Sequence, residues 1–215
     1  MYYQIITPSP ILDPFIKRYW MLETDELEGN VCERVVPTGN LQLMFHYRKP
    51  FTMKYPDATA WIQPQSFVSG LSNRFMDATT QGPSGVIAVE FHPHGASSFF
   101  RFPLNEIENK SIHLEDIFSG EIRYLEEQIN ECSDTQNRIA LIEKFLSGKI
   151  NPHNTNDFEL TRKAVKLIQQ SGGQIQAGQL AARLSVTPKN LERKFGTLIG
   201  KSPKQFIRII LSGSY

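Results

Sequence analysis

The chain has 215 residues, of which 40% are hydrophobic and 11% aromatic, and this is enough apolar material for one large or two modest folded cores. No stretch approaches the roughly 20 apolar residues of a membrane span, and the N-terminal sequence lacks a secretory signal, so we expect a cytoplasmic protein with no membrane partner. Two cysteines, Cys32 and Cys132, exclude a disulfide framework and a cysteine metal cluster.

The net charge of +1 conceals two oppositely charged parts. From Phe158 to Tyr215 the chain holds ten basic and two acidic residues, a charge of +8, whereas the preceding residues carry a charge of −7. A basic helical module is suited to binding duplex DNA, because lysine and arginine side chains that neutralise phosphates release the counterions condensed on the DNA. DNA would repel an acidic part, which is better suited to sensing or assembly.

The N-terminal part is predicted to consist mainly of short strands. A short helix is expected within residues 8–20, running into the first strand. Apolar runs rich in β-branched and aromatic side chains then occur at residues 31–36, 41–47, 61–70 and 86–91, separated by glycine, proline and asparagine turns. Many short strands at this spacing indicate an antiparallel sandwich or barrel.

After these strands the apolar pattern becomes helical. Short helices are expected at residues 95–100 and 104–108, and longer amphipathic helices through residues 125–132 and 139–146, the last with Asp134 as N-cap. The apolar stripes of the longer helices need a partner. Packing on the sheet of the same subunit and a dimer interface are the two alternatives, and we favour the first.

The C-terminal part begins after a polar segment, residues 147–156, which has no apolar periodicity and is predicted to be a linker. A helix is then expected at residues 157–170, ended by Gly172 and Gly173.

Two further helices are predicted on either side of a tight turn. The second begins at Thr187, a good N-cap, followed by Pro188 in the first helical position, and it ends at Gly200. Apolar residues recur at three- and four-residue spacing, so each helix has one buried face. They are Leu180, Ala181 and Leu184 in the first helix, and Leu191, Phe195 and Leu198 in the second.

This stretch resembles the first of the two helix-turn-helix units of AraC/XylS-type bacterial transcription regulators. The turn residue is usually glycine in that family and is Ser185 here, which predicts a left-handed serine with modest strain; Asn190 stands at an often aromatic position. The residues that carry the resemblance are Leu180, Ala181, Ser185, Thr187, Pro188, Leu191, Arg193, Phe195, Gly200, Ser202, Pro203 and Phe206.

The N-terminal part also resembles a domain found in a subset of these regulators. Residues 8–20, 35–47 and 86–118 carry the similarity, although Glu90 and His94 stand where the subset usually has arginine and glycine. The resemblance implies an α+β chain, with an antiparallel cupin-like β-barrel and trailing helices followed by a small all-α helix-turn-helix domain.

The implied domains are a cupin-like sensor or assembly domain at residues 1–146, with the barrel reaching to about residue 95, the linker at 147–156, and a partial DNA-binding domain at 157–215. The family carries a second helix-turn-helix after a helix that begins near Phe206, whereas this sequence stops at Tyr215. The resemblance therefore implies a shortened form that binds DNA weakly unless it dimerises. We expect Phe206, Ile207, Ile209 and Ile210 to be exposed, disordered or buried against another chain.

Double-stranded DNA is the expected partner of the basic part. The first turns of a recognition helix reach base edges, which assigns Lys189, Asn190, Glu192 and Arg193 to bases, with Lys194 a weaker candidate. The next helix start suits phosphates and assigns Lys201, Ser202, Lys204 and Arg208 to them. The alternative for both sets is a solvated polar helix face.

A metal site is a less favoured alternative. His92 and His94, with Glu90 and His46, have residue types that a cupin barrel can use for metal, but Pro93 and Gly95 indicate a strand end. No nucleophile motif, phosphate loop or carboxylate pair is present, so we expect no enzyme activity and no cofactor. A cupin-type metalloenzyme and a protein-interaction module with an acidic partner are the rival functions.

An effector and a homodimer are the remaining partners to test. A pocket between the sheets could be lined by the aromatic residues Trp61, Phe67 and Phe75 with Arg74 as a polar group, although plain core and surface positions are the simpler interpretation.

Overall fold

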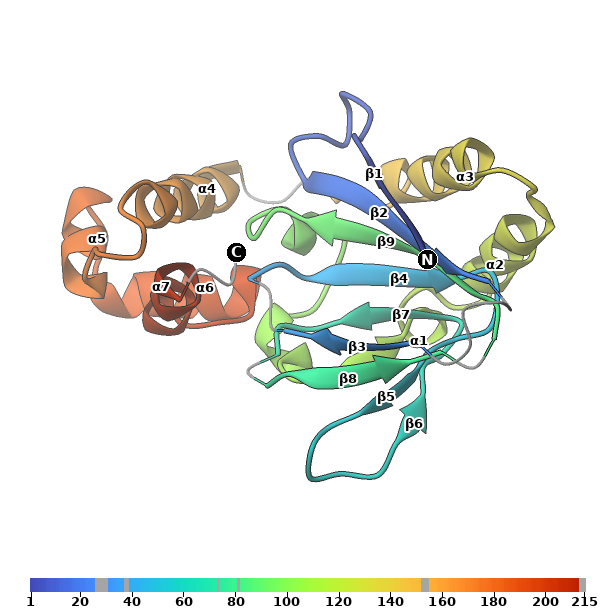
Figure 1. Cartoon of the computed structure of the whole chain (residues 1–215). Helices are drawn as coiled ribbons and strands as arrows, with labels where there is room; N and C mark the ends of the chain where they lie inside the picture. The colour runs from blue at the N-terminus through green and yellow to red at the C-terminus, as the bar shows by residue number, and fades with distance from the viewer. Residues whose placement is uncertain (26–30, 37–38, 73, 81, 152–154, 213–215) are drawn as a thin grey trace.

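The structure, a computed structural model, describes residues 1–25, 31–36, 39–72, 74–80, 82–151 and 155–212. Residues 152–154 of the predicted linker and the final residues 213–215 lie outside these ranges. Figure 1 shows two stacked sheets, helices that cover the far side of the larger sheet, and a group of helices at one end. In the described part of the chain, no helix combines the length and apolar character needed to cross a bilayer.

The larger sheet has six antiparallel strands in the order β1-β2-β9-β4-β7-β10. Their bounds are β1 Tyr2–Ile6, β2 Ile16–Thr24, β4 Gln42–His46, β7 Ser66–Ser69, β9 Ser84–Phe91 and β10 Ser111–His113. The smaller sheet has the order β3-β8-β5-β6, and its strands are β3 Cys32–Val35, β5 Thr52–Lys54, β6 Trp61–Ile62 and β8 Met76–Thr79.

Strand β9 shows why the larger sheet is the middle layer, because all eight of its residues are buried. Successive side chains of a strand point to opposite faces. Val86 and Ala88 pack with Met44 and Phe67 toward the smaller sheet. Ile87, Val89 and Phe91 belong instead to the core shared with the helices.

The antiparallel sheets were predicted, but the closed cupin-like barrel is wrong. The strands form two separate sheets, with β1 and β10 at the edges of one and β3 and β6 at the edges of the other. The physical reason is that the middle sheet has two apolar faces, one of which needs helices to cover it. The strands of the smaller sheet have only two to four residues, too few to curl around and close.

Between β9 and the end of α3 at Ser147 the chain forms five helical segments, interrupted by strand β10. They are the 3₁₀ turns η2 Ala96–Ser98 and η3 Leu104–Ile107, and the helices α1 Leu114–Phe118, α2 Glu121–Glu131 and α3 Thr135–Ser147. Asp134 caps α3 as predicted, since its side chain accepts the Asn137 N–H at 2.9 Å. The stripes of α2 and α3, exemplified by Leu125 and Ile142, are buried in the core with the middle sheet, so packing within the same subunit is confirmed.

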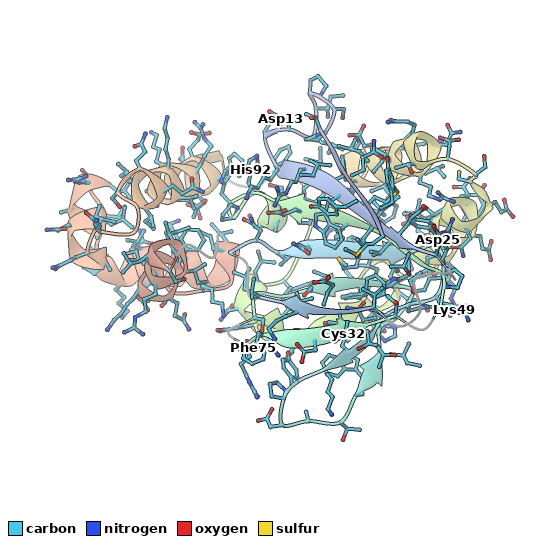
Figure 2. The ribbon with its side chains drawn as sticks, viewed as in Figure 1. Asp13, Asp25, Cys32, Lys49, Phe75 and His92 are labelled. Carbon is cyan, nitrogen blue, oxygen red and sulfur yellow. The ribbon has the colours of Figure 1, made fainter. Side chains whose placement is uncertain are left out.

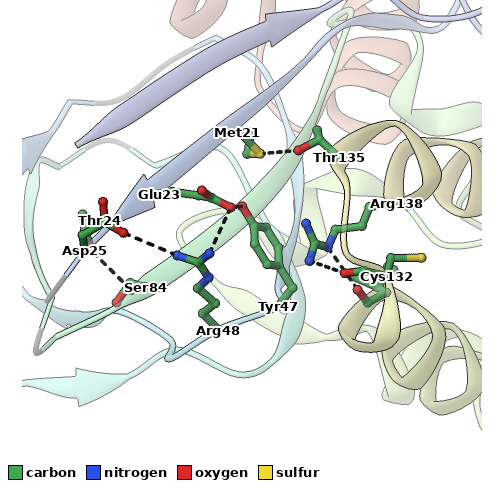
Figure 3. Close-up of polar contacts among 11 residues, drawn as sticks. Met21, Glu23, Thr24, Asp25, Tyr47, Arg48, Ser84, Cys132, Thr135 and Arg138 are labelled. Carbon is green, nitrogen blue, oxygen red and sulfur yellow. Dashed lines mark hydrogen bonds and ion pairs between the residues drawn. The ribbon is translucent and has the colours of Figure 1, made fainter.

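Polar contacts also join α3 to the sheet (Figure 3). Thr135 Oγ1 donates to the sulfur of Met21 at 3.0 Å. The Arg138 guanidinium lies 4.1 Å from the ring centroid of Tyr47 and donates to backbone carbonyls at the end of α2, including that of Cys132. Tyr47 in turn donates to Glu23 at 2.7 Å. The helix layer is thereby fixed to β2 and to the end of β4.

The remaining helices form what we call the helical unit: α4 Thr155–Gln170, α5 Ala177–Arg183, α6 Pro188–Ile199 and α7 Pro203–Leu211. Their buried side chains make a second core, which also includes Leu71 from the segment after β7. Gly172 and Gly173, at φ 57° and 75°, turn the chain after α4 as predicted.

The strand predictions were incomplete. Strands at residues 32–35, 42–46 and 84–91 match predicted runs, and the run at 61–70 is divided into β6 and β7. The short helix expected within residues 8–20 is a hydrogen-bonded turn, in which the Leu12 N–H donates to the Ser9 carbonyl at 2.9 Å. Strands β1, β5, β8 and β10 were not predicted, because three- to five-residue strands carry little pattern.

Candidate nucleic-acid interface

The turn between α5 and α6 is set by one residue in an uncommon backbone conformation. Ser185 has φ 55°, the left-handed conformation that the sequence predicted. The Val186 N–H donates to the Ala181 carbonyl at 3.1 Å, which closes the turn over the end of α5. The chain is thus redirected within a few residues into the start of α6.

Helix α6 is amphipathic, and its caps define its length. Thr187 Oγ1 accepts the Asn190 N–H at 3.2 Å, and Gly200 ends the helix at φ 87°. Leu191 and Phe195 are buried as predicted, but the third buried residue is Ile199 rather than Leu198.

The opposite face of α6 is open to solvent. Lys189, Glu192 and Arg193 are exposed, and the Arg193 guanidinium donates to Asn190 Oδ1 at 3.1 Å. These four residues line a shallow surface hollow at the start of the helix together with Thr187 and Pro188. The structure therefore brings all four predicted base-contacting residues together on one accessible surface. Lys194 lies aside from it, since its ammonium pairs with Asp157 of α4.

The predicted phosphate contacts divide into two groups. Lys204 and Arg208 are exposed on α7, and Ser202 caps that helix by accepting the Gln205 N–H at 3.2 Å. Lys201 is fully buried, with its Nζ 2.6 Å from Glu108 Oε1. The expected phosphate role of Lys201 is therefore contradicted, because its ammonium faces a carboxylate inside the protein.

Lys201 belongs to the contact that holds the helical unit on the sheet layers. Helix α6 packs on η2 and η3, and a Cβ atom on Gly200 would lie 3.0 Å from the Leu104 carbonyl oxygen. Leu71, which follows β7, is buried in the core of the helical unit. We call Leu71, Leu104 and Glu108 the docking site. It was not predicted, since no local pattern relates Glu108 to a lysine 93 residues away.

The end of α7 also differs from expectation. Phe206 is fully buried, and its ring lies 6.2 Å from that of Phe195, while Ile207 and Ile210 pack partly against the same core. The helix turns back over α5 and α6 and approaches Gly173 closely. The expectation that Phe206 is exposed, disordered or buried against another chain is therefore wrong.

The two histidines considered for metal lie beside α4. Figure 2 shows His92 at the corner of the sheet layer near Asp13 and the helical unit. The rings of His92 and His94 stack with centroids 5.4 Å apart, and His94 also meets the ring of Phe158 in α4 at 5.3 Å.

Glu90 does not join the two histidines. It is buried, and its carboxylate faces Lys17 at 3.2 Å, Arg18 at 2.6 Å and Asn40 at 2.5 Å. Within the described ranges, no three histidine, cysteine or acidic side chains converge as metal ligands would. The proposed ligand set is therefore not assembled.

Burial lowers the pKa of His46, His92 and His94, and the shift is large for His46 and His94. Burial, aided by the charges of His92 and Arg162, lowers the pKa of His94 to about 4, against the opposing influence of the Pro14 carbonyl and Glu159. Burial also lowers the pKa of His46 to about 4, despite a hydrogen bond between its Nε2 and Gln63 Oε1 at 3.0 Å. Both side chains are therefore neutral at pH 7.

A cavity of about 170 Å³ lies between the two sheets. We call it the inter-sheet cavity. Its walls are mainly apolar. The polar and charged side chains that also line it are those of Glu33, Asn40, Gln42, Gln63, Ser69, Ser72 and Arg74. Of the four residues predicted for such a pocket, Phe67 and Arg74 line it, Trp61 lines a neighbouring hollow, and Phe75 is exposed on the smaller sheet (Figure 2). The apolar walls are formed by Trp20, Leu22, Val35, Val36, Met44, Phe51, Met53, Phe67, Met76 and Ala78.

Comparison with known proteins gives a family for the N-terminal part. Residues 4–113, slightly more than half of the chain, match the family model described as a domain of unknown function, DUF6597. The chain belongs to this family. No curated protein matches the sequence.

Among solved structures, the chain is similar to apo ToxT from Vibrio cholerae strain SCE256, with 10% identity and a TM-score of 0.47, covering 89% of this chain and 79% of that one. It is similar to the AraC-like transcriptional activator CuxR, with 11% identity and a TM-score of 0.33, covering 99% of this chain and 86% of that one. It is also similar to ToxT bound to an unsaturated fatty acid, with 7% identity and a TM-score of 0.29, covering 90% and 95%. Similarities this distant decide neither the fold nor the activity of this chain.

Proposed function

We propose that the chain is a DNA-binding transcription regulator of the AraC type that acts in the cytoplasm. The part of the chain from α4 onward binds duplex DNA, the segment between α3 and α4 links the two parts, and the part up to the end of α3 senses a small molecule or mediates assembly. The observation that carries the proposal is the outer face of α6, where Lys189, Glu192 and Arg193 are exposed at the start of a helix that follows a tight turn. A helix presented in this way fits the major groove.

The charges around α6 support the same function. The exposed side chains of Lys204 and Arg208 lie on the adjacent helix, and the part of the chain that carries them has a charge of +8. In the proposed complex, Lys204 and Arg208 contact phosphates, and the amide groups at the start of α7 near Ser202 contribute a further anion contact. Lys201 contributes none, because it is buried against Glu108.

Replacing Arg193 with alanine is expected to weaken binding to duplex DNA from the neighbourhood of its own gene by about 10- to 100-fold and to relax sequence preference, because a bidentate guanine contact is lost. Lys204→Ala should weaken binding to all sequences alike and reduce the salt dependence by about one phosphate contact. Fluorescence anisotropy at several salt concentrations measures both effects.

The matched control for Arg193 is Arg123→Ala, since Arg123 is an exposed arginine on α2 in the acidic part of the chain. It should leave DNA affinity unchanged. Absence of any salt-sensitive affinity in the unaltered protein would contradict the proposal. Binding of an acidic protein that Arg193→Ala abolishes, without DNA binding, would favour the protein-interaction alternative.

The inter-sheet cavity is the proposed effector site. A cavity of about 150 Å³ lined by apolar side chains accepts benzene, so about 170 Å³ suits a small uncharged aromatic molecule. Gln42 and Gln63 at the wall offer amide groups to a hydroxyl or carbonyl of the ligand.

The wall of this cavity touches the docking site. Gly70 and Ser72 line the cavity, whereas Leu71 between them is buried among the helices of the helical unit. A Cβ atom on Gly70 would lie 1.8 Å from the Ile107 carbonyl oxygen, so this segment also packs tightly on η3. A ligand that moves residues 70–72 would therefore shift the position of α6, which couples effector binding to DNA binding.

Small neutral aromatic molecules such as indole or cresol are expected to raise the Tm of the protein in a concentration-dependent way, because ligands stabilise the state that binds them. Ala78→Phe should abolish the rise by filling the cavity. Ala140→Phe, on α3 away from the cavity, is the control. An equal rise in the Ala78→Phe protein would place the ligand elsewhere.

A further inference from the structure

Strand β1 forms an open edge of the six-stranded sheet. It pairs with β2 on one side, and among the described residues its backbone makes no hydrogen bond to another element. The side chains of Tyr2, Tyr3 and Ile5 are more than half exposed. An exposed edge offers unpaired N–H and C=O groups to another strand.

The sequence of β1 lacks the features that normally prevent an edge strand from pairing with another chain. Residues 2–7 contain no lysine, arginine, aspartate, glutamate or proline. Natural sheets keep their edges apart with charged side chains, proline or bulges. This edge is instead aromatic and β-branched, which is the composition of a paired strand.

One face of β1 continues the apolar surface of the sheet. Tyr3 lies opposite Leu22 and Ile5 opposite Trp20, so all four side chains share the face that turns toward the smaller sheet. The smaller sheet covers Trp20 and Leu22 in part, whereas Tyr3 and Ile5 remain 52% and 54% exposed. The Tyr3 and Trp20 rings lie 6.3 Å apart, so the exposed strip is continuous with the buried core.

We propose that β1 is the dimerisation surface of the protein and that it pairs antiparallel with β1 of a second copy. The strand is complementary to itself about Gln4. That register places each Tyr3 opposite Ile5 of the other copy and each Tyr2 opposite Ile6, with the two Gln4 side chains facing each other. Aromatic and β-branched residues make favourable cross-strand pairs, and a two-fold axis repeats each pair.

In this pairing, each face of β1 has an apolar surface to contact. The strip of Tyr3, Ile5 and Trp20 meets its copy on one face, while Ile6 on the other face already packs against the helix-side core. Helix α6 lies at a different end of the molecule from the free edge of β1, so a dimer of this kind leaves its outer face accessible (Figure 1). The assembly therefore presents two exposed α6 helices.

The test is the association state of the full chain in the absence of DNA, measured by sedimentation equilibrium. We expect a dimer at micromolar concentration, and Ile5→Lys should raise the dissociation constant at least about tenfold, because the two-fold axis places the charge in the interface twice. Ile62→Lys is the matched control, since Ile62 is 70% exposed on β6, the edge of the other sheet. It should leave the dimer intact.

A cross-link distinguishes the register. With Cys32 replaced by serine, Gln4→Cys should form an intermolecular disulfide under mild oxidation, because symmetric pairing brings the two Cα atoms within disulfide range. Ile62→Cys should not. A monomeric wild-type protein, or a dimer that Ile5→Lys and Ile62→Lys affect equally, would overturn the proposal. No DNA is present in these experiments, so neither result tests the proposed DNA-binding function.

Discussion

Glu108→Ala is expected to lower the free energy of unfolding by about 3 kcal/mol, whereas Lys201→Met should lower it by less than about 1 kcal/mol. The asymmetry follows from burial. The Lys201 side chain is completely buried, and the substitution at Glu108 removes the carboxylate 2.6 Å from its ammonium. The Glu108 side chain is 26% exposed, so water can reach it when Lys201 is replaced by an apolar side chain of similar length.

Urea unfolding of the two variants measures the difference, and the ion pair between Lys149 and Glu121 provides a control. Its atoms are also 2.6 Å apart, but its side chains are 22% and 66% exposed. Glu121→Ala should therefore cost less than about 1 kcal/mol. Equal losses of unfolding free energy in Glu108→Ala and Glu121→Ala would show that the ion pair with Glu108 is not needed to stabilise the buried Lys201.

Acid is expected to destabilise the protein between pH 6.5 and about 4 through His46 and His94. Burial lowers the pKa of each to about 4, from an ordinary value of 6.5. Within that interval the unfolded chain binds more protons than the folded one, so stability is fully present above pH 6.5 and falls as the pH falls. Each histidine contributes up to about 3 kcal/mol to the loss.

The change in Tm between pH 7 and pH 4.5 measures this effect. His46→Phe should reduce the loss while preserving the ring contacts with Phe51 and Phe67. His94→Phe should do the same at the contact with Phe158. Ile112→Phe, at a partly buried position on β10 with no titratable side chain, is the control and should leave the pH dependence unchanged. The idea fails if all three substitutions have the same pH dependence as the unaltered protein.

Local signals in the sequence predicted the geometry around α6. Thr187, Pro188 and Gly200 fix the ends of the helix through interactions with their near neighbours, and Ser185 adopts the left-handed conformation that the turn requires. Such features depend on a few consecutive residues, so they can be predicted without knowledge of the fold.

Contacts between distant segments could not be predicted in the same way. A charge count treats Lys201 as a surface cation, and only the fold shows that η3 brings Glu108 to it. Barrel closure failed as a prediction for a similar reason, because the alternation in β9 gives two buried faces without indicating whether strands or helices cover each. Strand β1 was not predicted, because so short a strand carries too little apolar pattern to indicate that it belongs to the sheet.

The position of the docking site also bears on how this family can be dissected. The segment that matches the family model ends at His113, the last residue of β10, so it contains none of α1 to α7. It does contain the docking site, Leu71, Leu104 and Glu108. Residues 4–113 expressed alone would expose the helix-side face of the middle sheet and the surface on which α6 packs. We expect that fragment to aggregate, and the smallest soluble unit to include the helices of both cores.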